Sequence, residues 1–475
     1  MGVGVTTGDG NTVLGYSAGL AITSGAENVF IGSNAGDALT TGYFNVGIGH
    51  EALSTEDGHG YNVAVGHHAL RVQNAGADAY NTAVGYSAGI AITTGTTTTL
   101  LGGFAGTALT TATENTALGY SALGAATTSA RNVAVGTLAL GSGVMNTGTN
   151  TYNVAVGFYA GKAITTGIQN TILGGLAGDA ITTGSNNIAL GYSALTTEDT
   201  GSRSVAIGSF ALHQQNNDAN NDNVAIGYNA GFTVTTGVEN TIIGSLAGDA
   251  LTTGVQNVAI GYEALSTENA HGTVVAVGFQ ALKTQDAGAN TYNVAVGYQA
   301  GVSVTTGTEN TLIGGLAGDA LTTGVQNVAV GYDTLSAIDS GSRNTAMGYQ
   351  ALKTLTLGGI GYNTAVGYNA GTLMTTGAQN TLVGGLAGDA LTTGNYNVAL
   401  GYGALGSEDA NSANVAIGYA ALTTLNAGAD GFNTAVGYSA GGNMTTGVQN
   451  TIIGGLAGDS LTTGENNIAM GYGAL

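Results

Sequence analysis

A short apolar run between an asparagine and a glycine recurs along the whole chain. The run is Asn, then Thr or Val, then a small or aliphatic residue, then Val, Ile or Leu, then Gly, as in residues 153–157. Copies begin every 17 residues, every fourth interval is usually 19, and there are 27 copies. A fixed short period that carries a β-branched run predicts a solenoid in which each copy forms one coil.

Positions within a coil are counted here from the residue at the Asn place. Position 5 is always Gly, which indicates a corner that needs a positive φ or has no room for a Cβ atom. Position 1 is Asn except at Thr98, Ser204 and Val274, and we expect these amides to form a ladder between coils. The pattern predicts a strand at positions 2–4 and a second at positions 11–14, as in residues 180–183. Helix is disfavoured because Gly and Asn recur too often.

The predicted fold is therefore all-β: a parallel β-solenoid, or β-roll, of about 27 coils with 17–19 residues each. Four coils make a super-repeat, since Asn187, Asn257, Asn327 and Asn397 are 70 residues apart. Residues 1–475 are predicted to form a single elongated domain. Residues 5–10 match coil positions 12–17, and the last coil stops at position 9, so we expect both ends to be uncapped.

The super-repeat alternates large and small residues. Position 9 is Gly in coils one and two and Leu in coils three and four, as in Gly178 and Leu195. Coil two also has a large residue at position 3 and a small one at position 6, such as Ile172 and Gly175. Elsewhere position 3 is nearly always Ala and position 6 is usually aromatic or His. We predict that positions 3 and 6 exchange volume at one packing surface.

The strand pattern also bears on association between chains. Positions 2, 3 and 4 are all apolar or Thr, although neighbouring strand residues face opposite sides. We expect an outward column of Ala and Ile at position 3, and a soluble monomer rarely exposes such a stripe. Lateral association into a homotrimer is the prediction, and a monomeric solenoid that tolerates exposed Ala is the alternative.

Composition removes several classes of function. There is no Cys, which excludes disulfide scaffolds, thiol nucleophiles and Cys-ligated metals. The net charge of −21 disfavours binding to nucleic acid or to an anionic membrane surface. No apolar run is long enough to cross a membrane. We therefore expect neither nucleic acid nor membrane insertion among the partners.

Acidic residues provide the candidate metal ligands. Position 10 of coil two is Asp in six super-repeats, in a segment close to a calcium-binding nonapeptide, and a solvated corner is the alternative. These residues are Asp37, Asp179, Asp249, Asp319, Asp389 and Asp459. A second acidic cluster lies in coil three, where a solvated face is favoured over a shared cation. Its members are Glu56, Asp57, Glu198, Asp199, Glu268, Asp339, Glu408 and Asp409. No other cofactor is expected.

The lengthened coils supply candidate binding loops. Their variable segments carry Arg71, Lys283 and Lys353, and projecting loops on a rigid scaffold often make contacts, although a spacer needs none. The six His form no repeated constellation and are expected at the surface. Chemistry requires a singular site, and the chain has no phosphate loop with its Lys and no nucleophile elbow. A polysaccharide lyase is the strongest enzymatic rival, but seven Lys and Arg meet its needs poorly, so we expect no enzyme.

The repeat carries a resemblance over nearly the whole chain. Asn-Val-Ala-Val-Gly resembles the head repeat of trimeric autotransporter adhesins, which form β-rolls packed as trimers. The coil Asn81-Thr-Ala-Val-Gly-Tyr-Ser-Ala-Gly89, with Thr93-Thr-Gly95, is more similar to the tandem repeats of phage tail-fibre and virion-fibre proteins. The resemblance implies a structural fibre shaft on a virion or cell surface that presents a receptor-binding tip. Repeated glycan or receptor binding, and an end-to-end extracellular filament, are the alternatives.

Overall fold

The computed structural model describes residues 8–148 and 150–475. The chain divides into two compact units, Met1–Glu239 and Asn240–Leu475, and each is described by itself. The predicted match of residues 5–10 to a coil falls partly on residues 1–7, which lie outside the described residues. That the whole chain is one domain stays a prediction.

Each coil contributes one three-residue strand at positions 2–4. The first unit contains β1 (Thr12–Leu14), β2 (Val29–Ile31), β3 (Val46–Ile48), β4 (Val63–Val65), β5 (Thr82–Val84), β6 (Thr99–Leu101), β7 (Thr116–Leu118), β8 (Val133–Val135), β9 (Val154–Val156), β10 (Thr171–Leu173), β11 (Ile188–Leu190), β12 (Val205–Ile207) and β13 (Val224–Ile226). The second unit contains β14 (Thr241–Ile243), β15 (Val258–Ile260), β16 (Val275–Val277), β17 (Val294–Val296), β18 (Thr311–Ile313), β19 (Val328–Val330), β20 (Thr345–Met347), β21 (Thr364–Val366), β22 (Thr381–Val383), β23 (Val398–Leu400), β24 (Val415–Ile417), β25 (Thr434–Val436), β26 (Thr451–Ile453) and β27 (Ile468–Met470).

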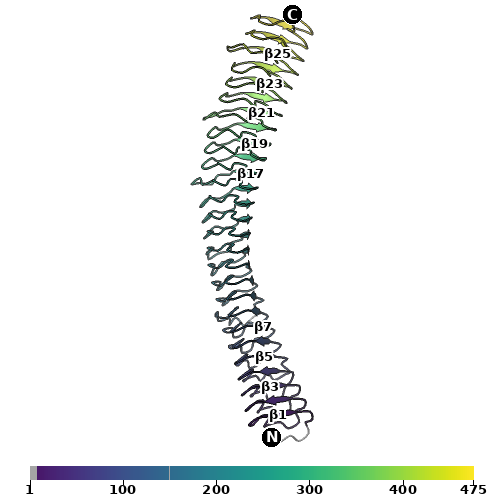
Figure 1. The fold of residues 1–475 in the computed structure, drawn as a ribbon, viewed down its shortest axis with the longest axis vertical. Coiled ribbons are helices and arrows are strands. Elements are labelled where there is room, and N and C mark those ends of the chain that lie inside the picture. Colours follow the sequence, from purple (N-terminus) through teal and green to yellow (C-terminus); the bar gives the residue numbers. More distant parts are fainter. Residues whose placement is uncertain (1–7, 149) are drawn as a thin grey trace. The chain divides into compact units, whose positions relative to one another are not determined.

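The strands pair in parallel with those of the adjacent coils. Between β9 and β10, for example, Ala155 is the partner of Ile172 and Val156 is the partner of Leu173. Consecutive strands lie one above the next in chain order within each unit (Figure 1). The predicted parallel β-solenoid of about 27 coils is confirmed. No helix in the described residues is long and apolar enough to cross a membrane.

The predicted second strand is wrong. Positions 11–14 form no strand in the described part of the chain, and residues 180–183 show why. The Ile181 N–H donates to the Gly178 carbonyl of its own coil at 3.2 Å, so the chain turns there. The Thr182 N–H then donates to the Asp199 carbonyl of the next coil at 2.6 Å. Hydrogen bonds between turning segments, rather than paired strands, therefore link the coils on this side: the Thr183 N–H also donates to the Asp199 carbonyl, at 3.2 Å.

The corner at position 5 has both of the features predicted for its Gly. Gly191 has a φ of 137°, and a Cβ atom built on it would lie 2.5 Å from the carbonyl oxygen of Gly208. Positions 7, 9 and 17 also have positive φ without needing Gly, as at Ser193 (51°), Leu195 (52°) and Arg203 (63°). Since L-residues adopt this conformation at a cost, the ladders between coils must impose it.

The predicted asparagine ladder is confirmed. Asn170 lies directly above Asn153 in the buried corner, and both its backbone N–H (3.0 Å) and its Nδ2 (3.1 Å) donate to Asn153 Oδ1. The Asn170 Nδ2 also donates to the Gly184 carbonyl of its own coil at 2.9 Å. Each amide therefore closes its own coil and holds the next one, which satisfies buried polar groups that would otherwise be costly.

The prediction that position 3 faces outward is wrong. Ala155 and Ala189 are fully buried inside the coil, together with position 8 and usually position 12. Positions 2 and 4 face outward instead, and Ile188 and Leu190 are 39% and 41% exposed. The outward stripe is therefore larger and more β-branched than an Ala column. An apolar stripe remains, but different residues form it.

The volume exchange also involves a different pair of positions. Position 6 points outward while position 3 points inward, so the two share no packing surface. Ile172 at position 3 instead fills the space left by Gly at position 9. A Cβ atom on Gly161 would lie 2.9 Å from Ile172 Cδ1, and one on Gly178 would lie 3.2 Å from it. Leu at position 9 in coils three and four is matched by Ala at position 3.

Candidate functional site

The six aspartates at position 10 lie on the surface at the turn after position 9. Asp179 accepts a short hydrogen bond from Thr196 Oγ1. Asp459 accepts a hydrogen bond of ordinary length, 2.9 Å, from Asn443 Nδ2. Partial burial raises the pKa of Asp37, Asp249, Asp319 and Asp389. In the described residues none of the six stands in a group of three carboxylates or imidazoles close enough to share an ion. Calcium binding stays a prediction.

The three basic residues of the lengthened coils are paired within the chain. Arg71 lies 3.7 Å from Glu51, Lys353 lies 2.7 Å from Asp333, and Lys283 pairs with Glu263. In each case the acid stands at position 7 of the preceding coil. These ion pairs neutralise part of the positive charge that a partner would recognise. The binding role of Arg71, Lys283 and Lys353 stays a prediction.

The second acidic cluster separates into two layers. Asp57, Asp339 and Asp409 at position 13 are exposed, as a solvated face requires. The glutamates at position 12 are not: Glu56, Glu198, Glu268 and Glu408 are all 0% exposed. For them the predicted solvated face is wrong, because position 12 points into the coil. The signal was present in the sequence, since other coils have Ile or Leu at that position.

Glu198 has the most complete set of partners among these glutamates. Its Oε1 accepts the Gly201 N–H at 2.7 Å, and its Oε2 accepts Gln215 Nε2 at 3.0 Å and Asn221 Nδ2 at 2.9 Å. All three partners are buried donors, which favours the ionised carboxylate. Desolvation by the surrounding coil opposes them and raises the pKa of Glu198 above its usual range.

Glu56 and Glu408 have fewer partners. Glu408 Oε1 accepts the Asn411 N–H at 3.1 Å, and Glu56 Oε1 accepts the His59 N–H at 3.1 Å. The Oε2 atoms of both have no hydrogen bond of good geometry within the described part of the chain. Burial raises the pKa of both carboxyls. These positions carry a buried acid at a cost that the rest of the fold must offset.

Buried glutamine at position 12 of coil four compensates for gaps in the asparagine ladder. Ser204 interrupts the ladder, and Asn223 Nδ2 donates to Gln215 Oε1 at 2.9 Å instead of to a preceding Asn. Val274 interrupts it again, and Asn293 Nδ2 donates to Gln285 Oε1 at 2.8 Å. The contact is not confined to gaps: Asn81 Nδ2 donates to Gln73 Oε1 at 2.9 Å although Asn62 keeps the ladder intact, whereas position 12 beside Asn344 is Leu355. Sequence analysis identified the interruptions but not these compensating residues.

Outward rings form a column at position 6. Tyr262, Phe279 and Tyr298 stack with centroids 5.4 and 5.3 Å apart and interplanar angles of 16° and 8°. Tyr402, Tyr419 and Tyr438 repeat this arrangement. Each stack covers coils three, four and the following coil one, and the small residue of coil two separates it from the next stack. The rings are about half exposed.

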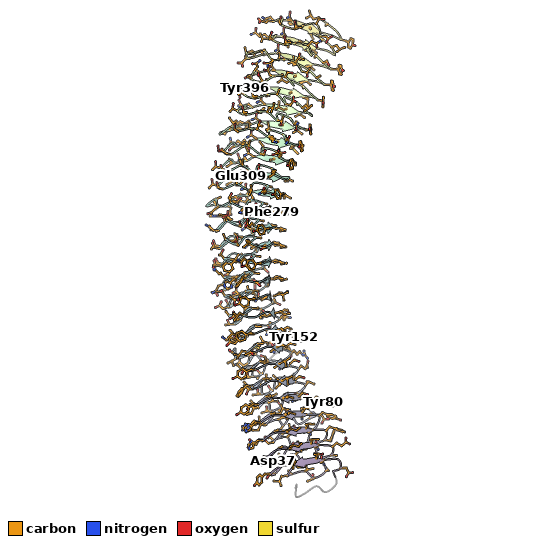
Figure 2. All side chains as sticks on the ribbon, viewed as in Figure 1. Asp37, Tyr80, Tyr152, Phe279, Glu309 and Tyr396 are labelled. Carbon is orange, nitrogen blue, oxygen red and sulfur yellow. The ribbon has the colours of Figure 1, made fainter. Side chains whose placement is uncertain are left out.

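A second outward column lies at position 17, which sequence analysis did not single out. Glu309 and Tyr396 belong to it, and in the lengthened coils the last residue before the next coil takes the same place, as at Tyr80 and Tyr152; all four are labelled in Figure 2. From Glu309 the column continues as a chain of contacts: Gln326 Nε2 donates to Glu309, Arg343 Nε donates to Gln326, and Arg343 donates to Tyr362 Oη at 2.7 Å. These ladders link consecutive coils at the surface.

Comparisons with known proteins supply no relative: no protein-family model, curated protein or solved structure matches the chain.

Proposed function

We propose that the chain is a structural fibre shaft, of the kind found in phage tail fibres and surface adhesins, which holds a receptor-binding tip away from a virion or cell surface. The observation that carries this proposal is the unbroken linkage of successive coils within each unit. Backbone rungs, the asparagine ladder and the outward side-chain columns all join neighbouring coils. This arrangement resists pulling and bending without requiring a singular chemical site.

We propose that the shaft is a homotrimer. Its support is the outward stripe of positions 2 and 4, where β-branched and aliphatic side chains remain partly exposed on a single chain. A stripe of this kind that continues from coil to coil is more typical of an interface than of a free surface. The acidic charge of −21 would keep assembled fibres apart in solution.

Light scattering coupled to size exclusion tests the assembly. The expected molar mass is about three times the 46.4 kDa of one chain. Replacing Val294 and Val296 with Glu should weaken the trimer, so that its mass falls towards that of one chain at a higher protein concentration than for the parent, because both side chains belong to the stripe. Thr323→Glu, at an exposed site away from the strand, is the matched control and should leave the mass unchanged. A monomeric parent chain contradicts the trimer, and open-ended polymers would point to a filament subunit.

The stacked rings favour one second candidate, a repeated binding module for glycans. Three consecutive stacks of Tyr and Phe at position 6 provide exposed aromatic edges at regular intervals in the second unit. Glycan-array binding by the chain without any tip would support this candidate. Replacement of Phe279, Tyr349 and Tyr419, the middle ring of each stack, with Ser should then remove the signal, whereas a silent array leaves the shaft as the function.

A further inference from the structure

Three histidines meet at the surface of the first unit. His50 and His67 occupy position 6 of successive coils, and His68 follows at position 7. The ring centroids of His50 and His67 are 4.9 Å apart, and those of His67 and His68 are 3.8 Å apart. One ring nitrogen from each of the three lies within 4.8 Å of the other two. No other place in the described residues brings three imidazoles together.

The cluster departs from the repeat at three positions at once. Three super-repeats later the equivalent residues are Tyr262, Phe279 and Gln280, and no other super-repeat has His at any of these places. Packing does not require the change, because Tyr262 and Phe279 also stack at these places, with ring centroids 5.4 Å apart. The three substitutions have one property in common, which is that each provides a ring nitrogen at the same point of the surface.

The backbone holds the two coils in a fixed relation at this point. The His68 N–H donates to the His50 carbonyl at 2.9 Å, and β3 pairs in register with β4 just before the cluster. Zinc bound tetrahedrally at 2.0–2.1 Å needs ligand nitrogens about 3.3 Å apart. The three nitrogens lie within 4.8 Å of one another, so binding requires side-chain rotations that shorten these separations, and the exposed His50 and His67 and the half-buried His68 have room for them.

Glu51 completes the surroundings of the cluster. Its Oε2 lies 3.2 Å from His68 Nε2, which is the placement of a carboxylate that orients a metal-binding imidazole. Arg71 lies 3.7 Å from the same oxygen, so the carboxylate is anchored on its other side. Three imidazoles and a neighbouring carboxylate suit a borderline transition metal better than calcium, which prefers oxygen ligands.

We propose that His50, His67 and His68 form a binding site for a divalent transition-metal ion of the Zn²⁺ class, which links two neighbouring coils. The fourth coordination position faces solvent and is open to water. The other acidic and imidazole group in this region, formed by Glu56, Asp57 and His59, is a weaker choice. Its Glu56 is buried, and its Glu–His pair recurs at Glu268 and His271, as expected of a structural contact.

Calorimetric titration of the full chain with ZnCl₂ tests the site, and one high-affinity ion per chain is expected. The sharpest variant is His50→Tyr, His67→Phe, His68→Gln, because it installs the residues that the fold already accepts at 262, 279 and 280. Binding should be lost with unchanged circular dichroism. The single change His68→Gln should weaken affinity by at least about 100-fold, since even outer-shell changes cost 10–100-fold.

His59→Gln is the matched control and should bind zinc as the parent chain does. The visible absorption bands of bound Co²⁺ give an independent readout of imidazole coordination, and they should disappear in His68→Gln but persist in His59→Gln. Zinc binding that survives the triple change, or that is lost in His59→Gln, overturns the proposal. So does a parent chain that gives neither a titration heat nor cobalt bands.

Discussion

Two regions with the same backbone fill the interior of the coil with opposite chemistry. In the coils of β11 and β12, the inward side chains at position 12 are Glu198 and Gln215, joined in a hydrogen-bonded network. In the coils of β19 and β20, the same positions hold Ile338 and Leu355, and both are fully buried. The strands, corners and rungs are alike in the two regions. The Gly corners and the ladders therefore set the shape of the coil. The side chain at position 12 only has to fill the interior and, where it is polar, find hydrogen-bond partners there.

The largest effect is expected where the two regions do not differ. Gly191→Ala and Gly331→Ala should each cost at least about 4 kcal/mol locally, because the new Cβ would lie 2.5 and 2.3 Å from a carbonyl oxygen of the next coil. Hydrogen exchange of the flanking strands measures the loss. Gly403→Ala is the control: it has open space around it at a position where other coils carry larger residues, so about 1 kcal/mol is expected. Equal costs at all three sites would refute the corner argument.

The same substitution should have different effects in two polar regions. Glu198→Ile removes the acceptor of three buried donors and should cost about 2–4 kcal/mol. Glu408→Ile removes a buried acid with one backbone partner, next to Leu425, and should cost less than about 1 kcal/mol or stabilise the coil. Hydrogen exchange around β11 and β23 compares them. If Glu408→Ile lowers the stability as much as Glu198→Ile does, an apolar side chain cannot replace a buried acid at position 12, and the comparison above fails.

The buried acids also predict a direction of pH dependence. Glu56, Glu198 and Glu408 have raised pKa values in the folded chain, so the folded state binds more protons than the unfolded state above about pH 4.5. The free energy of unfolding should therefore fall as pH rises from about 4.5 through these raised pKa values. Thermal unfolding between pH 5 and 7, at roughly constant ionic strength, measures the slope.

Repulsion within the net negative charge also grows as the carboxyls ionise and contributes to the same slope, so a variant is needed to isolate the buried acid. Glu408→Ile should unfold with a shallower pH dependence than the parent chain, since one raised carboxyl is gone. Glu309→Gln, at an exposed site, removes the same formal charge without removing a buried group. An identical slope in the Glu408→Ile variant and the parent would exclude the buried carboxyl as the cause.

The smallest effects are expected in the outer column at position 17. Arg343→Ala breaks contacts to Gln326 and Tyr362 in the apolar region and should cost about 0.5–1 kcal/mol. Arg203→Ala, in the polar region, removes only a 3.8 Å ion pair with Asp222 and should cost less. Hydrogen exchange of β12 and β20 resolves the difference. A larger loss in Arg203→Ala would contradict this order.

The sequence was most informative where the repeat admits little variation. Gly at position 5 and Asn at position 1 predicted the corner, the ladder and the parallel stacking because each has one physical explanation. It was least informative about which way a side chain points. Three successive apolar positions such as Val154, Ala155 and Val156 are compatible with either facing, so the inward Ala was assigned outward. The glutamates at position 12 were assigned to the surface, although the Ile and Leu of other coils mark that position as interior.

The candidate site was harder still, because its signal is spatial. His50 is separated from His67 and His68 by a whole coil, and only the vertical register of β3 and β4 places the three together. Likewise Gln215 compensates for Ser204 from eleven positions away. A repeat pattern shows which residue types occur at each coil position. These contacts depend instead on which residue occupies the neighbouring coil.

Strand contacts within each unit are confined to the immediately preceding and following coils, and this has a genetic consequence. Removing or duplicating one block of four coils within a unit, such as residues 257–326, leaves each new junction between coils of types that already adjoin elsewhere in the chain. Recombination between the segments that encode these similar blocks would therefore change the number of coils four at a time and keep the contacts on which each coil depends. The reach of such a protein is an inherited quantity that can vary without any new interaction having to evolve.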